Sequence, residues 1–141
     1  MKDAYITAFF DVVKDTQQTH GYDLPHHVEA YIVMLLGDFV DRTDIPPEKT
    51  FAEQFLNIQT SKQAKQLGDV CLIVSGVFPR LKEKHGLNRR YYQDIGSTSY
   101  EMASSMNTEL FPILAKHFVF LSGFIELAVS SPKLPHSNLF R

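Results

Sequence analysis

The stretch QLGDVCLIVSG, residues 66–76, decides the fold, because it sets one acid among apolar residues that continue on both sides at helical spacing. The apolar positions of this helix recur every three or four residues and are Ala64, Leu67, Cys71, Val74 and Phe78. Ser61 is a suitable N-cap, and Pro79 removes a backbone hydrogen bond near the other end. We therefore predict a central fourth helix that begins near Ser61 and is kinked near Pro79.

The chain before this helix also carries apolar residues at helical spacing. It predicts a first helix over residues 3–18 and a second helix that follows a cap at Asp23. Two adjacent prolines predict a connector over residues 42–49. A capping box formed by Thr50 and Glu53 then predicts a short third helix.

The chain after the fourth helix predicts two more helices. Asn88 is a suitable cap for the fifth, and a sixth helix, apolar on most sides, opens at Asn107 or Thr108. No alternation of apolar and polar residues typical of strands is present. We predict an all-α single domain of five to six helices over residues 1–130, with the second, fourth and sixth helices in its core. Residues 131–141 contain two prolines and predict an extended tail.

Composition narrows the class of protein. The chain has 141 residues, 44% of them hydrophobic and 21% charged, which is ordinary for a globular domain. A net charge of -2 argues against nucleic acid as a partner. No window reaches the roughly 18 apolar residues of a membrane span, and the first residues lack a signal-peptide pattern. Together with a single cysteine, these features predict a cytoplasmic protein without membrane contact.

Asp69 is the sharpest candidate for a functional residue, because an ionised carboxylate within an apolar helix needs hydrogen-bonding partners. Tyr92 and Tyr100 of the fifth helix are candidate donors, as are Arg89 and Arg90. Asp69 then either holds the fourth and fifth helices in register or lines a pocket between them. In the second case the ligand-binding residues are Asp69, Ser75, Tyr92 and Tyr100.

Glycines recur on the same two helices. Gly68 and Gly76 lie on the fourth helix, and Gly96 lies on the fifth. A glycine inside a helix lowers helix stability by about 0.8–1 kcal/mol relative to alanine. Close approach of the two backbones offsets that loss, so these positions predict a helix crossing. The alternative is that they form the floor of a ligand pocket.

A basic turn near the start of the fifth helix is a second candidate site. Arg80, Arg89 and Arg90 are its arginines, and guanidinium groups near a helix N-terminus suit phosphate or carboxylate groups. The hypothesis is an anion-binding surface. The alternative is a solvated loop whose bases pair with acids of residues 1–60, where most of the acids lie.

The sequence carries no motif typical of metal, cofactor or nucleophilic chemistry. One cysteine cannot build a Cys-rich zinc site, and neither Glu-x-x-His nor His-Glu-x-x-His occurs. Cys71 lies on the apolar stripe and predicts a buried, inert thiol. His117, on the apolar sixth helix, predicts a core or interface histidine. We expect no metal and no cofactor, and no convincing nucleophile–base pair favours an enzyme.

A succession of short motifs resembles a family of uncharacterised bacterial proteins. It consists of Leu67-Gly68-Asp69, Ser75-Gly76, Phe78-Pro79, Tyr91-Tyr92, Gly96 and Tyr100, closed by an apolar last helix. The matching part covers residues 61–130. The resemblance implies a bacterial, cytoplasmic, helical protein and carries no activity, cofactor or catalytic residue with it.

These observations favour a non-enzymatic protein-interaction module that forms a homodimer or binds another protein. The first and sixth helices carry more aromatic residues than a six-helix monomer easily hides, and association would cover them. The alternative is a small-ligand or anion-binding protein, including an enzyme, with its pocket between the fourth and fifth helices.

Overall fold

The computed structural model describes residues 2–40, 48–77 and 88–134, and every regular element within these ranges is helical. The α-helices are α1 (Lys2–His20), α2 (His26–Phe39), α3 (Glu48–Leu56), α4 (Ser61–Val77), α6 (Arg89–Met102), α7 (Phe111–Lys116) and α8 (Phe118–Val129). A 3-10 helix, η1 (Ser104–Met106), follows α6. The all-α prediction is confirmed, although the described ranges alone hold seven α-helices where five to six were predicted.

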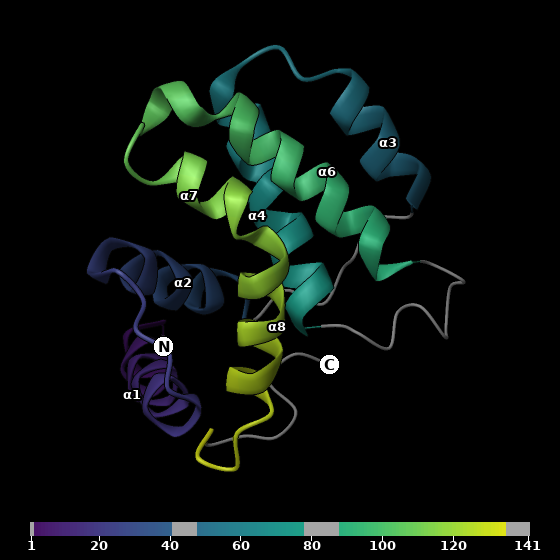
Figure 1. Ribbon diagram of the computed structural model, residues 1–141. Helices are drawn as coiled ribbons and strands as arrows, with labels where there is room; N and C mark the ends of the chain where they lie inside the picture. The colour runs from purple at the N-terminus through teal and green to yellow at the C-terminus, as the bar shows by residue number, and fades with distance from the viewer. Residues whose placement is uncertain (1, 41–47, 78–87, 135–141) are drawn as a thin grey trace.

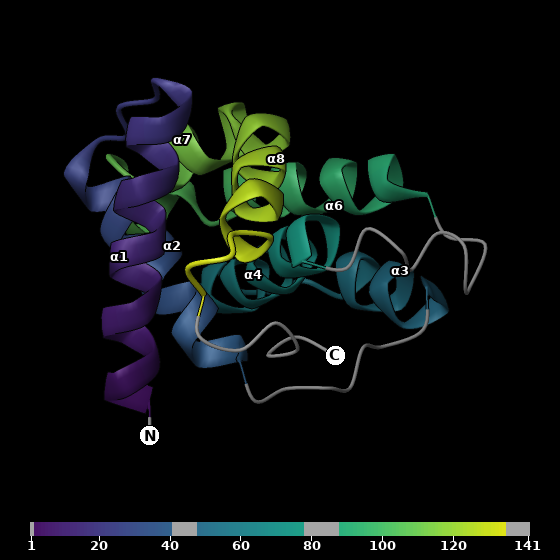
Figure 2. The same ribbon diagram turned by 90° about the horizontal axis from the view of Figure 1, so that it is seen from below.

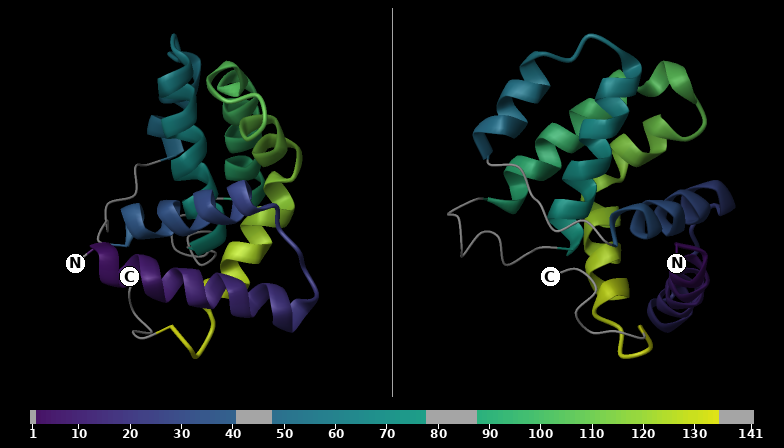
Figure 3. Two further views of the ribbon diagram at one scale, coloured as in Figure 1. Left: turned by 90° about the vertical axis from the view of Figure 1, so that its left-hand side faces the viewer. Right: turned by 180° about the vertical axis from the view of Figure 1, so that it is seen from behind.

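Helix α4 lies at the centre of the molecule (Figures 1 and 3). It packs against α6 and α8 most closely and also contacts α2 and α3. Six consecutive residues, from Cys71 to Gly76, are buried, so this part of α4 is covered on all sides. The fourth and last helices therefore lie in the core as predicted. The third predicted core helix, α2, packs less closely on α4 than α6 does. Figure 2 shows α1 and α3 at opposite sides of the molecule.

Helices α1 and α2 form an antiparallel pair tied together by buried polar side chains (Figure 3). Gly21 follows α1 with a φ of 71°, a conformation that favours glycine and turns the chain toward α2. The amide of Gln17 accepts a hydrogen bond from the backbone N–H of Leu24 at 2.8 Å and donates one to Glu29 at 2.5 Å. Lys14 forms an ion pair with Glu29 at 3.1 Å. These side chains stabilise the turn between α1 and α2, and the sequence analysis did not predict them.

The predicted sixth helix is not continuous, because the chain leaves helical geometry at His117. That residue has φ -105° and ψ 22°, and it separates α7 from α8. The bend lets α7 pack mainly on α6 while α8 packs on α4. His117 is exposed at the bend, so the first of its two predicted positions, in the core, is wrong, and the second, at an interface, stays a prediction.

The ends of the remaining helices differ from the predictions in detail. Asn88 caps α6 as predicted, since its side chain accepts a hydrogen bond from the backbone N–H of Arg90 at 2.8 Å. Helix α3 begins at Glu48, so Thr50 lies inside the helix and is not its cap. Residues 131–134 form turns after α8 in which Leu134 is buried, and Lys133 pairs with Asp15 of α1 at 2.7 Å. The predicted kink at Pro79 and the tail from 135 lie outside the described residues.

Candidate functional site

Asp69 joins three helices through both of its carboxylate oxygens. Oδ1 accepts hydrogen bonds from the hydroxyls of Tyr31 on α2, at 2.5 Å, and Tyr100 on α6, at 2.8 Å. Oδ2 accepts one from the Nζ of Lys65, one turn earlier on α4, at 2.9 Å. The Asp69 side chain is only 8% exposed, so these three donors replace the water that the carboxylate loses on folding.

A glycine explains how the tyrosine of α6 reaches this carboxylate. A Cβ atom at Gly68 would lie 2.6 Å from Cδ1 of Tyr100, so the aromatic ring occupies the space that a side chain would fill. The ring lies beside α4 next to Asp69, and its hydroxyl meets the carboxylate. Gly96 marks a second close approach, because its Cβ would lie 2.8 Å from the Cβ of Cys71. The glycines therefore mark helix crossings, as the first of the two sequence interpretations held.

Both tyrosine hydroxyls of this cluster stay protonated over a wide pH range. Burial raises the pKa of Tyr31 and Tyr100 well above the ordinary value, and the negative charge of Asp69 raises both further. A hydroxyl with a raised pKa is a hydrogen-bond donor and a poor base or nucleophile. The cluster is therefore suited to fixing α2, α4 and α6 against one another.

A cavity opens beside Asp69, on a different side of α4 from the one predicted. Its volume is about 780 Å³, and it lies between the end of α2, helix α3 and helix α4. The lining side chains are mostly polar: Asp38, Phe39, Thr50, Glu53, Gln54, Asn57, Ile58, Gln63, Gln66, Leu67, Asp69 and Val70. The space between α4 and α6, where a pocket was predicted, is filled at Gly68 and Gly96 by neighbouring side chains.

The four predicted ligand-binding residues do not meet at one place. Asp69 and Tyr100 bind each other directly. Ser75 lies farther along α4 and belongs to another hydrogen-bond network. Tyr92 is buried, with its ring 4.9 Å from the ring of Phe51. Sequence reasoning missed Tyr31 and Lys65, although Lys65 precedes Asp69 by the four residues that place two side chains on one helix face.

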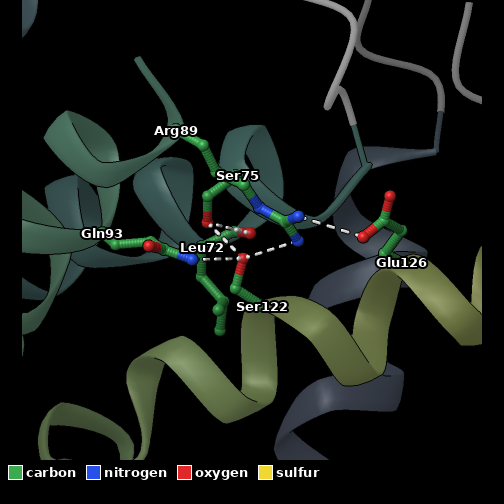
Figure 4. A network of polar contacts seen from close by, with 6 residues as sticks. All are labelled: Leu72, Ser75, Arg89, Gln93, Ser122 and Glu126. Carbon is green, nitrogen blue, oxygen red and sulfur yellow. Dashed lines mark hydrogen bonds and ion pairs between the residues drawn. The ribbon is translucent and has the colours of Figure 1, made fainter.

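The second polar network links α4, α6 and α8 (Figure 4). The hydroxyl of Ser122 accepts hydrogen bonds from Arg89 and Gln93, each at 3.3 Å, and donates one to Ser75 at 3.0 Å. Arg89 also forms an ion pair with Glu126 at 3.0 Å. The network connects three helices through one buried serine, which the sequence did not single out.

The arginines of the proposed anion site do not converge in the described part of the chain. Arg89 points toward α8, where it binds Glu126, while Arg90 pairs with Asp94 on its own helix at 3.4 Å. Arg80 lies outside the described residues. Both described guanidinium groups therefore have a carboxylate partner within the chain. Within the same described ranges, no group of three or more histidine, cysteine or acidic residues is arranged to hold a metal ion.

One face of α8 is exposed and apolar. Val119 is 63% exposed, Phe120 is 40% exposed and Leu127 is 39% exposed, and Gly123 lies between them. Tyr22, from the turn after α1, adds its ring beside Phe120 at 5.0 Å between centroids. We call these five residues the α8 surface. Figure 1 shows α8 on the near side of the molecule with no other helix in front of it.

Searches among known proteins return nothing: no family model, no curated protein and no solved structure matches this chain. The resemblance of residues 61–130 to a bacterial helical family therefore stays a prediction. In the described ranges, no helix combines the length and the apolar character that crossing a membrane requires.

Proposed function

We propose that this protein is a non-enzymatic interaction module that forms a homodimer through the α8 surface. The observation that carries the proposal is the exposure of large apolar side chains on one face of a single helix. Contiguous exposed apolar patches on a water-soluble domain mark interaction sites, because covering them removes apolar area from water. Homodimer interfaces are the more apolar class of protein interfaces.

The charge pattern around α8 supports this proposal. Glu126 is the charged residue nearest the α8 surface on the same helix, and Arg89 of α6 binds it at 3.0 Å. An unpaired carboxylate at an interface would resist desolvation, whereas a paired one is buried at a smaller loss of free energy. Helix α8 can therefore enter an apolar contact without leaving an isolated charge there.

The two polar networks also favour an interaction module over an enzyme. In both of them, the polar side chains bind one another across three helices. Their hydrogen-bonding capacity serves helix packing, and the proposed contact surface lies outside the Asp69 cluster.

The test is the mass of the protein in solution, measured by light scattering over a dilution series that spans micromolar concentrations. We expect a dimer for the native chain and a monomer, or a strongly weakened dimer, for Phe120→Ser. Met102→Ser is the matched control. Met102 is 45% exposed, as Phe120 is 40% exposed, but it lies at the C-terminal end of α6 and outside the α8 surface. A native chain that stays monomeric, or equal masses for the two variants, contradicts the proposal.

A second candidate function is small-ligand binding in the cavity beside Asp69. The volume of about 780 Å³ falls in the range of small-molecule sites, which is the observation that favours it. Native mass spectrometry of protein purified under mild conditions tests it. A bound small molecule that is absent from the cavity-filling variant Gln66→Trp supports this function, and a bare protein mass in both contradicts it.

A further inference from the structure

The cavity beside Asp69 receives one carboxylate from each of the three helices that enclose it. Asp38 lies at the end of α2, Glu53 lies on α3 and Asp69 lies on α4. The other polar side chains of the wall are uncharged, and they belong to Thr50, Gln54, Asn57, Gln63 and Gln66. Among the described residues of this wall there is no lysine, arginine or histidine. A cleft whose walls carry one sign of charge concentrates ions of the opposite sign, so the cavity favours a cation.

The negative charge of two of these walls reaches the same tyrosine. Burial raises the pKa of Tyr31, the charge of Asp69 raises it further, and the charge of Asp38 adds a smaller effect in the same direction. Carboxylates of α2 and α4 therefore act on one region beside the cavity. The ammonium of Lys65 pairs with Asp69 at 2.9 Å, and Lys65 itself is not part of the wall.

We propose that the cavity binds a linear organic polycation, a polyamine whose ammonium groups are separated by methylene chains. This inference rests on the second candidate function above and names the class of ligand. Carboxylates on three different walls suit several separated ammonium groups, because each positive charge can then approach a different wall. A single metal ion fits less well, since in the described ranges no three acidic, histidine or cysteine residues are arranged to hold one. An anionic ligand would be repelled by every charged group of the wall.

Apolar side chains share the wall with the carboxylates and suit the methylene chains of such a ligand. Phe39, Ile58 and Val70 line the cavity and are half-buried, and Leu67 lines it and is buried. Aliphatic stems with charged ends cover apolar surface while the charges stay with polar groups and water, as lysine side chains do. The cavity thus offers both kinds of contact that a polyamine makes.

Titration calorimetry of the full chain with spermidine tests this inference. We expect saturable binding that weakens as the salt concentration rises, because salt screens exposed charges. The double variant Asp38→Asn with Glu53→Gln should bind spermidine about tenfold more weakly, since it loses two exposed ion pairs to the ligand. Circular dichroism checks that this variant keeps its fold, which we expect because both side chains are exposed.

The matched control is the double variant Glu101→Gln with Glu109→Gln. It also removes two negative charges from exposed positions, but both lie outside the wall of the cavity, so spermidine should bind it as tightly as the native chain. An equal loss of affinity in the two double variants overturns the inference, because binding then depends on overall charge alone. Binding of Mg²⁺, supplied as its chloride, as tightly as spermidine and with the same loss in the Asp38→Asn, Glu53→Gln protein also overturns it.

The cavity-filling variant Gln66→Trp separates the class of ligand from the site itself. If spermidine does not bind at millimolar concentration, but native mass spectrometry finds a small molecule in the native chain and none in Gln66→Trp, the inferred class is wrong and the cavity remains a ligand site. If spermidine does not bind and both proteins show a bare mass, the inference and the second candidate function are overturned together.

Discussion

Gly96 and Gly123 are expected to respond in opposite ways to the same substitution by alanine. Both lie inside a helix, where alanine is intrinsically favoured over glycine by about 0.8–1 kcal/mol. At Gly123 an added Cβ meets no atom within 4 Å. We therefore expect Gly123→Ala to raise the free energy of unfolding of the monomer by about 1 kcal/mol.

At Gly96 the added methyl group has no room. Its Cβ would lie 2.3 Å from Cζ of Phe118 and 2.8 Å from Cβ of Cys71, and both of these residues are buried. Overpacking of a core lowers stability by about 1–3 kcal/mol. After the gain in helix propensity is subtracted, Gly96→Ala should lower the free energy of unfolding by up to about 2 kcal/mol.

Urea unfolding followed by circular dichroism measures both effects. The protein must be dilute enough for light scattering to give a monomer mass, so that changes at the dimer contact do not enter. In thermal unfolding, Gly96→Ala should melt lower by up to about 8 °C, and Gly123→Ala should melt higher than the native chain. If Gly96→Ala proves as stable as Gly123→Ala, then α4, α6 and Phe118 do not meet closely, and the packing inferred for the centre of the fold is wrong.

Three further predictions concern the polar networks. Asp69→Asn should lower the free energy of unfolding by about 2–4 kcal/mol, because its carboxylate binds three donors at a buried position, and an unchanged urea midpoint would contradict this role. The contribution of the protonated Tyr31 and Tyr100 hydroxyls to stability is fully present below about pH 10. Above that pH only the unfolded chain releases these two protons, because the pKa values of both tyrosines are raised in the folded chain. The free energy of unfolding should therefore fall by up to about 1.4 kcal/mol per pH unit for each tyrosine. Tyr100→Phe should make this decline shallower, and the same slope in both proteins would refute the explanation. Ser122→Ala should lower stability by about 1–3 kcal/mol, measured by the same urea titration, because it removes the one hydroxyl that Ser75, Arg89 and Gln93 all bind; no change would show that the network contributes little.

The sequence predicted those features that depend on local pattern or on a single chemical necessity. Apolar spacing located α4, and Asn88 was recognisable as a cap because the short polar side chain precedes a helical pattern. Asp69 had to find donors once it was assigned to an apolar helix, and Tyr100 was among the candidates. These inferences needed no knowledge of which helices are neighbours.

Features that depend on packing between helices were missed. Tyr31 binds Asp69 because α2 crosses α4 at that point, and nothing in the local pattern of α2 fixes the crossing. No proline or glycine at His117 predicts the bend there. The bend arises because α7 packs on α6 whereas α8 packs on α4. The position of the cavity also depended on packing, because the ring of Tyr100 fills the space beside Gly68.

The central position of α4 has a consequence for synthesis on the ribosome. Its closest neighbours, α6 and α8, follow it in the chain, and the last of them ends at Val129. A growing chain that has emerged only as far as Val77 therefore holds the buried residues of α4 without the helices that enclose them. The N-terminal half cannot mature ahead of the rest, and the interval before α8 emerges is when a growing chain is most exposed to chaperones and to premature association.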